Sequence, residues 1–177
     1  MKKVFHLILM LVAATVLQSC CWNGDCDETD DFPVTLVESQ FEPVYMPRPE
    51  FENSVELGPA QVVINSGKIY VIGSYLFINE KNKGFHVFNN EDPSNPTSLY
   101  FITSPGATDL AIRENVLFIN QATDLIAVAI DFTTGGLTVS KRIKNTFPIM
   151  LSPDGFYPEN LPVDNVVINW IPKIVTP

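Results

Sequence analysis

After position 60, apolar residues come in short runs that are rich in β-branched and aromatic side chains and are separated by turn residues. Runs of this length predict strands, and several in succession indicate an all-β fold. No capped segment with a 3.6-residue period follows Leu17, so we expect almost no helix. The first group of strands is expected at residues 61–65, 68–72, 75–79 and 84–88.

Turn residues and prolines mark the segments around these strands. At residues 92–96 (DPSNP), Asp92 can accept a local backbone hydrogen bond while Pro93 presets φ for a turn. Residues 32–59 are rich in proline and are expected to form an extended lead-in, with a short edge strand at 34–37. Near the end of the chain, residues 151–160 are expected to be loop and residues 165–171 one more strand.

The chain contains a second copy of its strand pattern. YLFIN at residues 75–79 matches VLFIN at 116–120, an offset of 41 residues, and FHVFN at 85–89 corresponds to LIAVA at 125–129 with one residue gained or lost between. A period near 40 with several short strands is typical of β-propeller blades. We therefore expect repeats at about residues 67–107 and 108–148.

These segments resemble one known family. GKIYV (67–71), YLFINE (75–80), KGFHVFNN (83–90) and DPSNP (92–96) are together similar to the LVIVD-repeat lipoproteins, bacterial β-propellers mostly without an assigned activity. The resemblance runs from about Gly58 to Asp131. It departs from the family pattern at Asn89 and Ala129, where the family's string closes with aspartate.

The resemblance implies antiparallel blades, but the chain is short for a propeller. The part from Gly58 to Pro177 has room for fewer than three repeats, whereas closed propellers use 4–8 blades. We therefore expect a partial, open propeller-like array, similar to the amino-terminal part of such a protein or to a truncated member. Residues 116–119 and 125–130 are apolar on both alternating faces, so an uncovered blade face predicts self-association or a partner chain.

The amino terminus has the features of a secretory signal. Met1-Lys2-Lys3 precedes an apolar run over residues 4–17, which is shorter than the roughly 20 residues of a membrane-spanning helix. The sequence LQSC ending at Cys20 resembles the bacterial lipobox, in which the cysteine carries lipid and the leader is cut off before it. The alternative is cleavage elsewhere with Cys20 as an ordinary thiol. We expect a signal peptide at 1–19, a tether and lead-in at 20–58, and the repeat region at 59–177.

An acidic segment follows the proposed lipid site. Five carboxylates lie within residues 25–31, which indicates a solvated, flexible tether. The position of this run after a lipobox resembles the export signal of lipoproteins that reach the outer face of the outer membrane, although a plain linker explains it equally well. If Cys20 carries lipid, Cys21 and Cys26 form a candidate disulfide, and their spacing is not that of a metal site.

The net charge disfavours two kinds of binding partner. The formal net charge is −9, and removal of Lys2 and Lys3 with the leader makes it more negative by two. Nucleic acid and direct electrostatic docking on anionic lipid are therefore disfavoured, and contact with the membrane is expected through the lipid.

Candidate catalytic groups are few. His86 is the one histidine outside the leader, and it lies within a predicted strand without a partner, so we expect a structural role. No nucleophile elbow, zinc helix, phosphate loop or dinucleotide fingerprint occurs, and we expect no catalytic residue, metal or cofactor. Carboxylates at turns or strand ends are expected to be solvated or capping: Asp109, Asp124, Asp131, Asp154, Glu159 and Asp164.

The sequence therefore favours a lipid-anchored, non-enzymatic, propeller-type binding module at the outer membrane, exposed at the cell surface, with a protein or glycan ligand. Two alternatives stay open. One is a surface glycan-processing enzyme of propeller architecture, with two carboxylates facing each other across a pocket. The other is a truncated remnant of a longer propeller lipoprotein.

Overall fold

A computed structural model describes residues 38–131 and 134–174. The signal peptide, Cys20, Cys21, Cys26 and the expected strand at 34–37 lie outside these residues. In the described part of the chain, no helix is both long and apolar enough to cross a bilayer.

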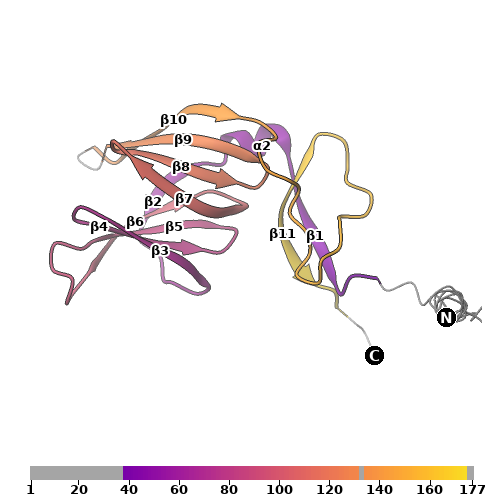
Figure 1. Cartoon of the computed structure of the whole chain (residues 1–177), viewed down its shortest axis with the longest axis horizontal. Coiled ribbons are helices and arrows are strands. Elements are labelled where there is room, and N and C mark those ends of the chain that lie inside the picture. The colour runs from indigo at the N-terminus through magenta and orange to yellow at the C-terminus, as the bar shows by residue number, and fades with distance from the viewer. Residues whose placement is uncertain (1–37, 132–133, 175–177) are drawn as a thin grey trace, which may run out of the picture. The chain divides into compact units, whose positions relative to one another are not determined.

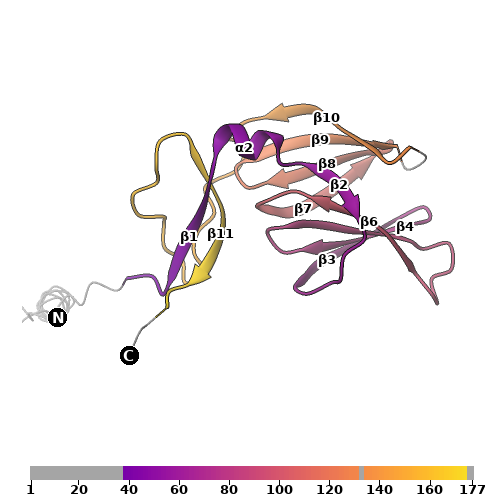
Figure 2. The same cartoon turned by 180° about the vertical axis from the view of Figure 1, so that it is seen from behind.

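The described strands pair antiparallel throughout, which confirms an all-β fold (Figure 1). The first sheet has the order β2-β6-β5-β4-β3, with β2 on the edge beside β6 (Figure 2), and the second has the order β10-β9-β8-β7. The first sheet contains β2 (Glu56–Pro59), β3 (Ser66–Ile72), β4 (Tyr75–Glu80), β5 (Gly84–Asn89) and β6 (Thr97–Thr103). The second contains β7 (Ala107–Arg113), β8 (Val116–Gln121), β9 (Asp124–Asp131) and β10 (Gly136–Ile143).

A third, two-stranded sheet pairs β1 (Phe41–Pro47) with β11 (Asn165–Pro172). The short helix α2 (Arg48–Asn53) follows β1, and its Phe51 is buried against Ala122 and Val166. Residues 38–59 are thus more structured than the extended lead-in that the sequence predicts. Six residues with a proline in the first turn carry no 3.6-residue period, so the pattern of apolar residues could not indicate this helix.

The two sheets repeat one topology. Strands β3 to β6 and strands β7 to β10 each form a four-stranded meander in which consecutive strands pair. The matching segments YLFIN and VLFIN are β4 and β8, the second strand of each meander. The turn after β4 spans residues 81–83 and the turn after β8 spans residues 122–123, which accounts for the one-residue difference between the copies.

The sheets stack in the same orientation. The shared core contains Phe77, Phe85 and Val87 from the first sheet, and Leu117 and Ile119 from the second. Side chains alternate along a strand, so the residue equivalent to Phe77, which is Phe118, lies on the opposite face of the second sheet. The faces that meet are therefore different faces of the repeat. We call them the inner faces, and the two faces that point away from the shared core the outer faces.

The strand expected at residues 61–65 is wrong. This segment contains no strand, because its backbone pairs with a side chain: the Ile64 and Asn65 amides donate to the Glu80 carboxylate at 3.0 and 2.7 Å. The apolar run there leaves Val62 and Ile64 largely exposed. β-branched composition alone therefore misled the sequence interpretation.

Other local expectations are confirmed. The strands over 68–72, 75–79, 84–88, 116–119, 125–130 and 165–171 all lie inside observed strands, and residues 151–160 contain no helix or strand. The Asp92 carboxylate accepts the Ser94 amide at 3.0 Å, the local bond expected of this turn. The sequence did not indicate β6, β7 and β10 separately.

Candidate functional site

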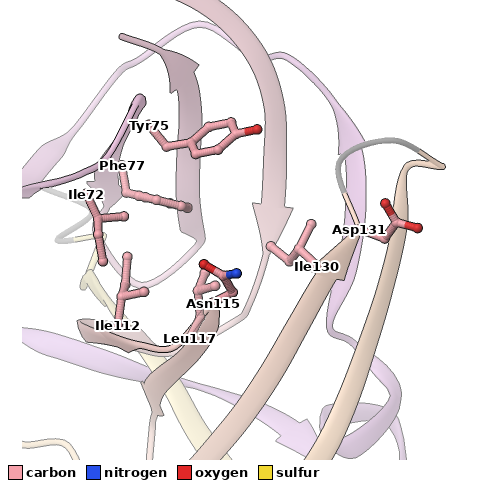
Figure 3. A pocket seen from close by; sticks show the side chains of 8 residues that line it. All are labelled: Ile72, Tyr75, Phe77, Ile112, Asn115, Leu117, Ile130 and Asp131. Carbon is pink, nitrogen blue, oxygen red and sulfur yellow. The ribbon is translucent and has the colours of Figure 1, made fainter. Parts of the chain in front are cut away.

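A cavity of about 330 Å³ opens between the first and second sheets, near the turns that follow β3 and β7 (Figure 3). We call it the hairpin-end pocket. Its lining comes from both meanders, and Figure 3 shows the side chains arranged around it: Ile72, Tyr75, Phe77, Ile112, Asn115, Leu117, Ile130 and Asp131.

The lining of this pocket is mainly apolar, with three polar side chains. Asn115 is held in the turn after β7 with a left-handed φ of 64°. Asp131 accepts a hydrogen bond from the Thr134 hydroxyl at 2.8 Å, which fixes its carboxylate at the end of β9. A concave apolar surface with a few oriented polar groups is the usual form of a small binding site.

A second cavity, of about 290 Å³, lies on the outer face of the second sheet. We call it the outer-face pocket. It is bordered by Phe147, whose amide donates to the Thr123 carbonyl at 2.9 Å. The Asn120 carboxamide oxygen in its lining is buried and has no hydrogen-bond partner among the described residues. The lining is Asp109, Leu110, Ala111, Phe118, Asn120, Leu125 and Phe147.

Asp109 links the two sheets. Its carboxylate accepts the Tyr70 hydroxyl at 2.5 Å and forms an ion pair with Lys68, both from β3. The Lys68 and Tyr70 hydrogen bonds lower the pKa of Asp109. Burial, together with the bond to Asp109, raises the pKa of Tyr70 to about 12. Asp109 therefore lies inside β7 and serves the contact between sheets, whereas the sequence placed it at a turn or strand end.

Asp124 is fully buried at the start of β9, so the expected solvated or capping role is wrong. Its carboxylate accepts Arg48 at 2.7 Å, Arg142 at 3.0 Å and the Asn145 amide at 3.1 Å. Burial raises the pKa of Asp124, but these three donors outweigh it and the net shift is downward. This cluster joins α2, β9 and β10.

His86 lies in β5, as predicted, and is fully buried. Its Nε2 is 3.0 Å from a Glu80 carboxylate oxygen, and its ring packs against Phe101 with 4.8 Å between centroids. Burial raises the pKa of Glu80, while the bonds from the Ile64 amide, His86 and the Asn65 amide bring it below its usual value. The pair has no access to solvent, so it holds strands together and cannot reach a substrate.

Asp154, Glu159 and Asp164 lie between β10 and β11 and contact residues 40–48. Asp154 accepts the Gln40 amide at 2.8 Å and the Ser152 hydroxyl at 2.5 Å. Glu159 and Asp164 contribute backbone carbonyls, which accept the Tyr45 hydroxyl and the Arg48 amide. Within residues 38–131 and 134–174, no three His, Cys, Asp or Glu side chains gather as a metal site would require. The candidate lipid site Cys20 and candidate disulfide Cys21–Cys26 lie outside those residues.

Comparison with known proteins gives no relative. No family model matches the chain, and neither a curated protein nor a solved structure matches it.

Proposed function

We propose that this chain is a lipid-anchored, non-enzymatic binding module of propeller-type architecture, and that the hairpin-end pocket receives an apolar side chain of a protein ligand. The observation that carries the proposal is the stacking of two like-oriented four-stranded meanders with this pocket open between them. Radially repeated four-stranded sheets are the unit of propellers, which supports the resemblance to LVIVD-repeat lipoproteins.

The lining favours a protein ligand over a glycan. Sugar hydroxyls need a high density of hydrogen-bonding groups, whereas this pocket offers Ile72, Phe77, Ile112 and other apolar side chains. The pocket also favours binding over glycan processing, because glycoside hydrolysis uses two carboxylates and Asp131 is the one acid among its described lining residues.

Indole, the side chain of tryptophan, is a direct probe of this pocket. We expect it to shift the methyl NMR signals of Ile72, Ile112 and Ile130 in residues 20–177 carrying Cys20→Ser, with a dissociation constant of about 1 mM, as a ligand of this size allows. The Ile130→Trp variant fills the cavity and is expected to abolish the shifts of Ile72 and Ile112.

Val163→Trp is the matched control, because Val163 is 88% exposed in a loop and does not line the pocket. It should bind indole as the parent chain does. Shifts that persist unchanged in Ile130→Trp, or that are absent from the three isoleucines, would contradict the assignment of this pocket.

The anchor is tested separately. Cys20→Ala in the full chain is expected to block leader cleavage and to leave the precursor without lipid, because the thiol is the acylated group. The measurement is metabolic labelling with a palmitate analogue together with the gel mobility of the chain, and Cys21→Ala is the control that should retain the label. Equal labelling and equal processing in both variants would show that Cys20 is not the lipid site.

A further inference from the structure

We propose that the outer face of the second sheet binds a second copy of this chain, which presents the outer face of its own first sheet. The proposal rests on the stacking of the two sheets and not on the ligand of the hairpin-end pocket. The outer face of the second sheet is defined by Ala111, Phe118, Asn120 and Leu125, and that of the first by Ile69, Val71, Leu76 and Ile78.

The interface inside the chain is the template for this contact. Phe77 is 1% exposed at the contact between the sheets, and its equivalent Phe118 lies half-buried on the outer face. Phe85 and its equivalent Leu125 differ in the same way. The outer face of the second sheet is therefore equivalent to the inner face of the first sheet, which packs against the second sheet.

The complementary surface is exposed at the other end of the stack. Ile69 and Val71 are each 63% exposed on β3, while their equivalents in β7 are Leu110, which is buried in the shared core, and Ile112, which packs against it. Along β3, the outer face of the first sheet therefore exposes side chains whose equivalents in the second sheet pack in the shared core, whereas His86 and Phe101 on the same face are buried. Exposed apolar surface of this kind marks an interaction site.

Lys68 and Asp109 occupy equivalent positions in the two repeats, 41 residues apart, and they pair across the interface inside the chain. This ion pair already joins the two sheets of one copy, so the contact between copies rests on the apolar side chains of the two outer faces.

After β10, the backbone follows the repeat as far as Phe147 and then departs from it. The Gly106 amide donates to the Asn82 carbonyl just before β7, and the Phe147 amide donates to the equivalent Thr123 carbonyl, each at 2.9 Å. Pro148 follows where β7 begins in the first case, and no strand forms in residues 148–164. Phe147 therefore covers one end of the outer face, and the part around Ala111, Phe118 and Leu125 stays open for the second copy.

This contact joins two different faces, so it is heterologous, and an open assembly keeps one free face of each kind at its two ends until a ring closes. With two sheets from each chain and 4–8 sheets in closed propellers, two to four copies close the ring. Cyclic symmetry places residue 38 of every copy on the same side, which suits anchors that reach one membrane.

Sedimentation equilibrium of the full chain in density-matched detergent tests the proposal. We expect the wild type at about 100 μM to have the mass of two to four chains. Phe118→Lys and Val71→Lys each block one face and are each expected to be monomers, whereas their equimolar mixture forms a dimer through the two intact faces. Val163→Lys, altered on an exposed loop, should behave as the wild type.

A wild-type monomer would overturn the proposal and assign the outer face to another occupant. A mixture that stays monomeric would overturn the head-to-tail arrangement. So would a single variant that still associates, because a contact between two copies of the same face survives in the variant that keeps that face intact. As a check that does not depend on a lysine variant folding, benzoylphenylalanine in place of Phe118 should crosslink to residues 69–78 of another copy. Crosslinks to the second sheet of another copy, or none, would also overturn it.

Discussion

Replacing Asp124 with asparagine is expected to lower the free energy of unfolding by about 3 kcal/mol, because removal of one partner from a buried ion pair leaves the other charges uncompensated. Arg48 and Arg142 both donate to one carboxylate oxygen of Asp124, and both guanidinium groups lie 5.3 Å from the centre of the Phe51 ring. An asparagine amide keeps the shape but not the charge. Urea unfolding followed by circular dichroism measures the loss.

Asp92→Asn is the matched control. Asp92 is exposed, and an asparagine oxygen can accept the Ser94 amide as the carboxylate does, so the expected change is within about 0.5 kcal/mol. If Asp124→Asn also changed stability by less than 1 kcal/mol, the arginine cluster would not be what holds α2 against β9 and β10.

The pH dependence of the same cluster has a defined sign. The pKa of Asp124 is lowered in the folded protein, so its contribution to stability is fully present above the unfolded value near 3.9 and is lost as the pH falls through the folded value. The stability difference between the parent chain and Asp124→Asn should therefore shrink below about pH 4. A difference that stayed constant down to pH 2 would contradict the assigned pKa shift.

Local patterns in the sequence predicted β4, β5, β8 and β9 well, because each strand is a short run of mainly β-branched, aromatic and other apolar residues that ends at turn residues. They failed at residues 61–65, where a carboxylate from β4 takes the place of a neighbouring strand. They failed again at Asp124, whose arginine partners lie 76 and 18 residues away in the chain. A buried and a solvated aspartate look the same in a sequence when their partners are distant.

The candidate site was harder to predict than the fold. The hairpin-end pocket combines residues from Ile72 to Asp131, and which side chains meet depends on how the two meanders stack. The matching strands in the sequence indicated the repeat. Which faces of the two sheets meet follows only from burial, because Phe77 is buried between the sheets and its equivalent Phe118 is half-buried on the outer face. Only the packed structure could distinguish the inner faces from the outer faces.

Gly84→Ala is expected to lower the free energy of unfolding by about 4 kcal/mol, more than alanine at the other glycines discussed below. Gly84 begins β5 with a φ of +148°, a conformation that side chains rarely adopt. An added Cβ would overlap the Ile102 carbonyl oxygen and lie 3.0 Å from the Ser104 amide nitrogen. Both groups are backbone, so the clash can be relieved only by moving β5 away from β6.

Two other glycines separate the steric cost from the conformational cost. Gly73 has a positive φ of 55° but open space around it. We therefore expect Gly73→Ala to lower the free energy of unfolding by about 1 kcal/mol, from backbone strain alone. Gly58→Ala, in β2, meets nothing closer than 3.9 Å and should be close to neutral. Thermal unfolding of the three variants ranks their losses of stability. Equal losses for Gly84→Ala and Gly73→Ala would contradict the prediction. They would mean that β5 and β6 can separate near Gly84 at little cost in free energy.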